Sequence, residues 1–381
     1  MRVASYNPSC KRKQSLPACV LLCIAALCFT WPTYARDAVT YRLTYIATPQ
    51  PEEPNDLNTF LISDLNNKGE VLGAHPGPDG VQHAFIWRDG VFHDLNRFVA
   101  PDVIIINPNA FNDRSESVGV YYGSSIVFQP FFLGTQHRAI PLTGVVGDRE
   151  HITPVGINNR DEILIDTYTS GVGGRAIVWR HGKATTLQVL PGADDMIPLA
   201  INNKGIAIGY GRHNFLYSTT PVLWQDGTVM PLPGPQGSDG ALPVALNDGN
   251  VVALWAVFRD EFPGREQAYL WHDGTITVLL PPSPDLNRTV PNAMNDSNVV
   301  TGFSYNLAGK SVPTIWRGRR GQDVNTLICP TDPLARFVHI DSVGLINERG
   351  QILAHGTDSR QPDHLGSSYL LTPKVRHKHP Q

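Results

Sequence analysis

Aromatic, histidine and charged side chains recur in this 381-residue chain just after short apolar segments. Flat rings can cover the apolar face of a sugar, and planar guanidinium or imidazole groups can bond to its hydroxyls, so these residue types suit a carbohydrate ligand. The candidate ligand-binding residues are Tyr121, Tyr122, Tyr168, Tyr210, Arg212, Trp255, Arg259, Tyr305 and His355. The sequence leaves a second interpretation open, in which they end buried strands and cap the core.

The segment 255–265 is one of the richest of these stretches. It combines Trp255 with Arg259, Asp260, Glu261 and Arg265. It is a candidate ligand loop, and equally a solvated loop that its aromatic residues hold in place.

Acidic residues form a second set, and their spacing admits two chemistries. Asp56, Asp102, Asp148 and Asp285 each lie ten residues before a recurring asparagine. If they point inward, their oxygens form a ring that could hold Ca²⁺. A glycoside hydrolase or lyase could instead use two carboxyl groups drawn from Asp102, Asp148, Asp166 and Asp285. The plain alternative is that aspartate begins turns by accepting bonds from nearby backbone N–H groups.

Sequence signatures of catalysis are missing. The chain has no Gly-x-Ser-x-Gly elbow, no His-Glu-x-x-His, no phosphate loop and no Cys-x-x-Cys. The interpretation that follows is a binding protein without covalent chemistry and without a cofactor, with the carbohydrate-active enzyme as the alternative.

The elements that position these residues come from seven repeats, each of which contains an apolar residue followed by asparagine. The spacings between successive asparagines are 46, 46, 44, 45, 48 and 52 residues. Three residues further on stands a Gly, Asn, Asp or Ser, and these types favour a tight turn that closes on a left-handed residue. The repeated asparagines are Asn66, Asn112, Asn158, Asn202, Asn247, Asn295 and Asn347.

Each of the first six repeats contains four short strand patterns, the third of which carries an aromatic near its end. A period of about 46 residues with four strands is typical of a β-propeller blade. The seventh repeat stops at its third strand, and residues 41–46 can supply the missing fourth one. The sequence therefore predicts an all-β, seven-bladed β-propeller that its N-terminal strand closes, since closure removes the open sheet edges.

The repeats resemble those of the bacterial extracellular HAF-repeat family. His83-Ala84-Phe85 matches the signature of that family, and the Asn-x-x-Gly and Trp-x-x-Gly turns match as well. The resemblance covers nearly all of the chain after residue 35. It implies secretion and a repeat propeller, and it brings no catalytic residues.

Loops of the predicted propeller divide into a uniform set and a variable set. The turns between strands one and two and between strands three and four are short and alike. The connections between strands two and three and between blades differ from repeat to repeat. Variable loops on a rigid frame commonly carry binding, so we expect the functional face there.

Residues 1–35 have the pattern of a secretory signal peptide. Four basic residues precede an apolar stretch of about 16 residues, which is short for a membrane span, and small residues precede a cut after Ala35. We expect residues 36–373 to form the propeller and residues 374–381 a basic tail. Cleavage leaves one cysteine, Cys329, so no disulfide can form within the mature chain.

Cleavage also changes the formal charge from −3 to −7, because four basic residues and no acidic ones leave. An acidic exported chain is poorly suited to nucleic acid or an anionic membrane. The sequence thus predicts an exported, periplasmic or extracellular monomer with no membrane span, whose partner is a polysaccharide or another protein.

Overall fold

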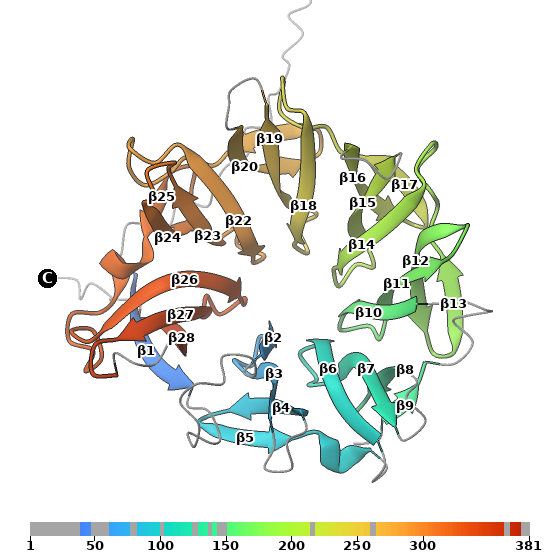
Figure 1. The fold of residues 1–381 in the computed structure, drawn as a ribbon, viewed down its shortest axis with the longest axis horizontal. Helices are drawn as coiled ribbons and strands as arrows, with labels where there is room; N and C mark the ends of the chain where they lie inside the picture. The colour runs from blue at the N-terminus through green and yellow to red at the C-terminus, as the bar shows by residue number, and fades with distance from the viewer. Residues whose placement is uncertain are drawn as a thin grey trace, which may run out of the picture. The chain divides into compact units, whose positions relative to one another are not determined.

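Seven four-stranded antiparallel sheets stand around a common axis in the computed structural model (Figure 1). The chain divides into two units, Met1–Thr33 and Tyr34–Gln381. The structure describes residues 39–46, 61–76, 82–99, 103–123, 129–135, 139–142, 151–213, 218–259, 264–361 and 366–374, all within the second unit. The predicted signal peptide, 1–35, lies outside the described residues. No helix among them is long and apolar enough to cross a membrane.

The first four blades follow the chain in order, each from its innermost to its outermost strand. Blade one is β2 (Leu61–Leu65), β3 (Val71–Pro76), β4 (Gln82–Arg88) and β5 (Val91–Asp94), and blade two is β6 (Val103–Phe111), β7 (Ser117–Gly123), β8 (Gln129–Leu133) and β9 (Ala139–Pro141). Blade three is β10 (His151–Ile157), β11 (Ile163–Thr169), β12 (Gly173–Arg180) and β13 (Lys183–Thr186), and blade four is β14 (Asp195–Ile201), β15 (Ala207–His213), β16 (Ser218–Gln225) and β17 (Thr228–Pro231).

The remaining blades include the one that closes the ring. Blade five is β18 (Gly240–Leu246), β19 (Val252–Phe258), β20 (Arg265–His272) and β21 (Thr275–Val278), and blade six is β22 (Arg288–Met294), β23 (Val300–Tyr305), β24 (Ser311–Trp316) and β25 (Gly321–Asp323). Blade seven is β26 (Val338–Ile346), β27 (Ile352–Asp358), β28 (Ser367–Lys374) and, outermost, the N-terminal β1 (Thr40–Ile46). Two short 3₁₀ helices, η1 (Asn96–Phe98) and η2 (Val324–Leu327), lie in blade connections.

The seven-bladed propeller and its closure by the N-terminal strand are confirmed. β1 pairs antiparallel with β28 from Thr40↔Lys374 to Ile46↔Ser368. A loop of the preceding connection then covers its outer edge, because the Leu43 N–H donates to Asp332 Oδ2 at 3.0 Å and the Cys329 N–H donates to the Tyr41 carbonyl at 2.8 Å. Lys374, expected in the tail, is the last residue of β28.

Turns of the predicted left-handed type close all seven first hairpins. The residue three after each repeated asparagine has a φ between +58° and +83°. Glycine adopts this region freely, while Asn, Asp and Ser adopt it at modest cost. The seven residues are Gly69, Ser115, Asp161, Gly205, Asn250, Asn298 and Gly350.

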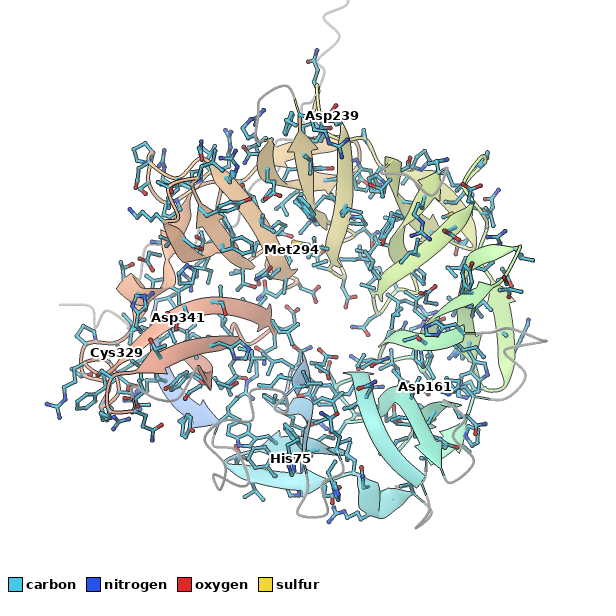
Figure 2. All side chains as sticks on the ribbon, viewed as in Figure 1. His75, Asp161, Asp239, Met294, Cys329 and Asp341 are labelled. Carbon is cyan, nitrogen blue, oxygen red and sulfur yellow. The ribbon has the colours of Figure 1, made fainter. Side chains whose placement is uncertain are left out.

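The hydrophobic core lies between neighbouring blades, where side chains fill the space (Figure 2). Between blades four and five, for example, Ile208 and Leu223 pack with Leu254 and Tyr269, all of them buried. Each sheet thus buries its faces against its neighbours, which is why one blade cannot fold alone and seven can.

The innermost strand of each blade carries a β-bulge just before its asparagine. In blades two to six a proline precedes the shift in register, such as Pro198 before Ala200. Proline suits a bulge because it has no N–H to leave unpaired, and the bulge turns the strand end toward the axis.

Candidate functional site

Two ends of the propeller must be distinguished. The Asn-turn face carries the seven turns that begin with the repeated asparagines. The loop face is the opposite end, where the connections between second and third strands and between blades lie. Since strands alternate in direction within a blade, each face collects one class of connection.

The repeated asparagines form a closed ring of hydrogen bonds on the Asn-turn face, which we call the axial ring. Each side-chain Nδ2 donates to the backbone carbonyl of the asparagine in the next blade, and Asn347 donates to Asn66 at 2.9 Å to complete the circle. The other six distances lie between 2.9 and 3.2 Å. All seven asparagines are buried, so these bonds join every neighbouring pair of blades away from water.

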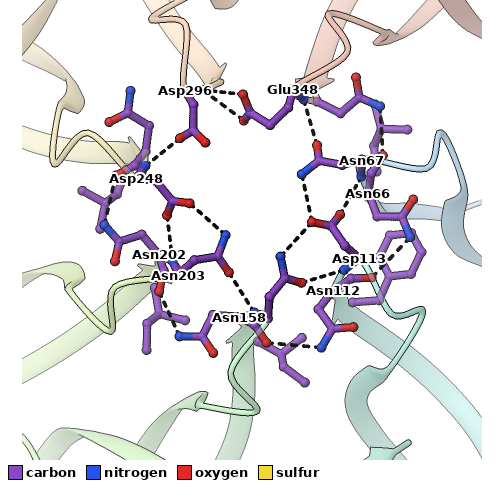
Figure 3. Close-up of a pocket in the computed structure, with 18 of the residues that line it drawn as sticks. Asn66, Asn67, Asn112, Asp113, Asn158, Asn202, Asn203, Asp248, Asp296 and Glu348 are labelled. Atoms are coloured by element: carbon purple, nitrogen blue, oxygen red, sulfur yellow. Dashed lines mark hydrogen bonds between the residues drawn. The ribbon is translucent and has the colours of Figure 1, made fainter. Parts of the chain in front are cut away.

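The residues that directly follow these asparagines form a second closed circle, the inner ring (Figure 3). The backbone N–H of each donates to the side-chain oxygen of the next at 2.7 to 3.0 Å. Its members are Asn67, Asp113, Asn159, Asn203, Asp248, Asp296 and Glu348. Together with the axial ring they line a cavity of about 200 Å³.

The inner ring is uneven in charge. Asp113 accepts side-chain amide bonds from Asn67 at 3.0 Å and from Asn159 at 2.8 Å, and Asp248 accepts one from Asn203 at 3.0 Å. Asp248, Asp296 and Glu348, by contrast, follow one another in three successive blades; we call them the carboxylate arc. Burial and the charge of Asp296 raise the pKa of Glu348 to about 7.

The structure brings four predicted site residues together on the loop face, between blades three and four. We call His151, Asp166, Tyr168, Asp195, Tyr210 and Arg212 the blade 3–4 cluster. Register places Tyr168 opposite His151 in blade three, and Arg212 opposite Asp195 in blade four. The charge of Arg212 acts on Asp166 across the two blades, and Tyr168 and Tyr210 are close enough to Arg212 to influence its pKa.

Asp195 is the buried anchor of this cluster, with 1% of its surface exposed. Oδ1 accepts the Gly174 N–H at 2.7 Å, and Oδ2 accepts the guanidinium of Arg212, with Nε at 2.8 Å. Although burial opposes ionisation, these donors lower the pKa of Asp195. Sequence reasoning missed this residue, because nothing in the sequence indicates its pairing with Arg212.

The pKa of Asp166 is shifted in the opposite direction. Burial raises its pKa to about 6, with the charge of Asp195 adding to the rise and that of His151 opposing it. Tyr168 stands nearby with 38% of its surface exposed. The cluster therefore offers an aromatic ring, a guanidinium and a weakly acidic carboxyl group to solvent-borne ligands.

The other predicted ligand residues lie in blades two, five, six and seven, away from this cluster. The Tyr121 hydroxyl donates to Gln129 at 3.4 Å, the Tyr305 hydroxyl donates to Glu266, and His355 Nδ1 bonds to Ser368 Oγ at 3.1 Å. Trp255 is half-buried in β19, and the Arg259 N–H donates to Asp239. Tyr122 lies in β7, but its side chain is outside the described residues.

The predicted aspartate ring is only partly visible. Asp56, Asp102 and Asp148 lie outside the described residues. Asp285 is exposed and forms an ion pair with Lys310 at 2.7 Å, which lowers its pKa to about 2. The carboxylates that do meet at the axis belong to the Asn-turn face. Among described residues, no group of three or more His, Cys, Asp or Glu side chains is placed to hold a metal ion.

Comparisons with known proteins bear on the fold. No family model and no curated protein matches the chain. The β-propeller domain of the Trilobed protease from Pyrococcus furiosus is similar in structure, with a TM-score of 0.54 and 9% identity over 84% of this chain and 95% of that one. This chain is a β-propeller. The domain from the protease has an open velcro topology, whereas here β1 pairs with β28.

Two further propellers are less similar. YCF48 from Cyanidioschyzon merolae has a TM-score of 0.44 and 10% identity, over 87% of this chain and 98% of that one. A gluconolactonase from Xanthomonas campestris has a TM-score of 0.37 and 10% identity, over 87% and 100%. A shared fold does not determine function, so the function must be argued from the site.

Proposed function

We propose that this protein is an exported, non-catalytic propeller that binds extracellular polysaccharide at the blade 3–4 cluster. The observation that carries the proposal is the meeting of Tyr168, Arg212 and Asp166 on the loop face. An exposed ring offers a stacking surface, and the charged groups beside it offer donors and acceptors to sugar hydroxyls. Export is supported by the pattern of residues 1–35 and by the resemblance to HAF-repeat proteins.

The chemistry of the cluster favours binding over hydrolysis. A glycosidase needs a protonated acid and a second carboxylate that is free to attack or to activate water. Asp166 could serve as the acid, but the ionised partner is Asp195, which is buried and accepts bonds on both oxygens. In the described part of the cluster, the carboxylate that would have to react therefore already accepts hydrogen bonds from the protein itself.

Binding to a panel of cello-, chito- and manno-oligosaccharides tests the proposal. We expect one class to bind, and Tyr168→Ala to weaken that binding at least about tenfold while leaving the melting temperature unchanged, since an aromatic contact is a common source of binding free energy. Tyr45→Ala is the matched control, because Tyr45 is similarly exposed, at 42%, but lies on the outermost strand of blade seven.

Three results would contradict the proposal. Equal loss of affinity in the Tyr45 and Tyr168 variants would move the site elsewhere. Release of shorter sugars would indicate an enzyme. Absence of binding to the whole panel, with capture of a secreted protein, would favour a protein partner.

A further inference from the structure

The residue eight positions after each repeated asparagine lies in the second strand of its blade, and its type changes around the ring. Blades four, five and six have an aromatic side chain there, namely Tyr210, Trp255 and Phe303, and blade three has Asp166. All four side chains are half-buried. Three successive blades therefore present one partly exposed aromatic ring each.

Strand register places an apolar partner directly opposite each of these rings. Ile197 pairs with Tyr210, Leu242 with Trp255, and Val290 with Phe303. Directly opposite residues lie on the same side of a sheet, so each ring and its partner form one surface, which we call a platform. The three partners are half-buried as well. We call the three platforms together the aromatic stripe.

The same positions carry different side chains in the other blades. The pairs there are Leu61 and Ala74, Asn107 and Val120, Thr153 and Asp166, and Ser342 and His355. None of these pairs contains Phe, Tyr or Trp. Since a blade of this propeller folds without an aromatic platform, the presence of platforms in three neighbouring blades favours a ligand over packing as their reason.

The aromatic stripe begins at the blade 3–4 cluster and continues around the axis. Its residues belong to the first and second strands of each blade, which are the two nearest the axis (Figure 1). Tyr210 is a member of both groups, and Asp166 occupies in blade three the position that the rings occupy in the next blades. The stripe therefore extends the cluster across blades five and six.

Blade six ends the stripe with a pair of rings that have polar groups beside them. The ring centroids of Phe303 and Tyr305 are 5.7 Å apart. The Tyr305 hydroxyl donates to Glu266 of blade five, and the Arg288 guanidinium lies 6.0 Å from the centre of the Tyr305 ring. The apolar stripe thus has hydrogen-bonding groups at both ends, as a hydroxyl-rich chain requires.

We propose that the aromatic stripe binds successive units of one extended polysaccharide chain, another part of which occupies the blade 3–4 cluster. This inference rests on the function proposed above. Facing sheets pack about 10 Å apart, so platforms in neighbouring blades are spaced for a polymer of linked rings rather than for a single sugar. Pyranose units with equatorial hydroxyl groups, as in cello- and chito-oligosaccharides, direct C–H groups at a flat surface, which suits an aromatic ring flanked by an aliphatic side chain.

Chain length tests this inference. Titration calorimetry measures the dissociation constants of the purified protein for dimers and hexamers of the cello and chito series. We expect the hexamer of one series to bind at least about thirtyfold more tightly than its dimer, because it reaches platforms that the dimer leaves empty. Trp255→Leu, in the middle of the stripe, should reduce this ratio to about fivefold, which a hexamer gains merely by offering several positions to a site for a dimer.

Substitutions at Trp255 identify the occupant of the stripe. Trp255→Phe keeps a flat ring and should retain most of the ratio, whereas Trp255→Leu keeps an apolar surface without a ring. A ratio that Trp255→Leu leaves intact would show that the ring does not stack on sugar. Phe303→Leu makes the same comparison if Trp255→Leu does not fold. Tyr45→Leu, on the outermost strand of blade seven, is the control and should leave the ratio unchanged.

Failure of this inference and failure of the proposed function give different results. If dimer and hexamer bind within about fivefold of each other and Tyr168→Ala weakens both, the blade 3–4 cluster binds sugar and the stripe does not. If neither length of any series binds, both proposals are wrong. A length effect confined to the manno series would contradict the class of sugar. Capture of a secreted protein that Trp255→Leu abolishes would assign the stripe to a protein partner.

Discussion

The same five-residue turn occurs at both ends of the propeller, with different consequences. Asn202 on the Asn-turn face and Asn306 on the loop face each accept two backbone N–H bonds on Oδ1 at 3.0 to 3.1 Å. Each also closes a backbone pair with the residue four positions on. Asn202 is buried and donates to Asn247 of the next blade at 3.0 Å, whereas the Asn306 amide donates to the Asp285 carbonyl at the surface.

This difference teaches that the turn motif does not itself build the ring. Local sequence determines the turn, and its place at the axis determines whether the free amide reaches another blade. On the Asn-turn face seven such amides act together, while on the loop face the polar contacts between blades differ from one pair of blades to the next. The Asn-turn face therefore carries the repeated, stabilising contacts, and the loop face carries the varied side chains suited to recognition.

Replacing each of the two asparagines by alanine, in separate variants, should give the largest difference between the two faces. Asn202→Ala leaves a carbonyl and two N–H groups without their buried partner, so we expect a loss of about 3 to 5 kcal/mol in the free energy of unfolding. Asn306→Ala exposes its N–H groups to water and should cost about 1 kcal/mol or less. Urea unfolding measures both losses, with one value for the dependence of the free energy of unfolding on urea concentration fitted to all variants.

Asn202→Asp separates the two roles of this side chain. It keeps the acceptor within the turn but sets a buried carboxylate oxygen against the Asn247 carbonyl and Asn250 Oδ1, so its loss should equal or exceed that of Asn202→Ala. Equal losses for the two alanine variants would mean that the axial bond adds nothing to the turn.

The connection between blades six and seven also contributes to closure, through the edge of β1. Asp332 accepts the Leu334 N–H at 2.9 Å within its own turn and the Leu43 N–H at 3.0 Å from the N-terminal strand. Asp332→Ala should therefore cost about 2 kcal/mol and speed hydrogen exchange across Thr40–Ile46, because a buried N–H loses its acceptor.

Asp323→Ala provides the matched variant. Asp323 accepts the Asn325 N–H at 2.9 Å in the same local geometry, and this bond lies within its own turn. Its loss should be about 1 kcal/mol, without faster exchange in β1. Faster exchange in both variants would assign the effect to general loosening of the connection between blades six and seven.

The fold could be predicted from the sequence because its determinants are local and repeated. The asparagine and the left-handed residue three positions later fix each hairpin, and Tyr41–Ile46 completes a pattern that the seventh repeat leaves short. The repeat length of about 46 residues then indicates a propeller, since seven similar four-stranded units can bury the faces of their sheets only against one another.

The candidate sites were harder to predict because they depend on which turns and blades meet. Asp248, Asp296 and Glu348 occupy turn positions, and only their convergence on the axis makes them neighbours. The residue directly after each asparagine is always an amide or a carboxylate, and this was a usable signal. On the loop face, Tyr168, Tyr210 and Arg212 stood out by type, but the link from Arg212 to Asp195 depends on the register of β14 and β15.

The smallest expected effect concerns Asp166, and it distinguishes a recognition group from a structural one. Its pKa is about 6 when folded against about 3.8 when unfolded, so the folded state binds more protons between these values and loses stability as pH rises through them. Asp166→Asn should remove that loss and stabilise the protein by about 1 kcal/mol at pH 7, allowing for partial exposure to solvent. The gain over the unmodified protein should grow from pH 4 to about 6.5 and then stay constant.

Asp285→Asn is the control of opposite sign: with a folded pKa of about 2, its contribution is lost only on acidification, so its difference from the unmodified protein should be flat from pH 4 to 7. If Asp166→Asn is less stable than the unmodified protein at pH 7, the carboxylate of Asp166 stabilises the blade 3–4 cluster, as that of Asp195 does, and its role is structural rather than ligand binding.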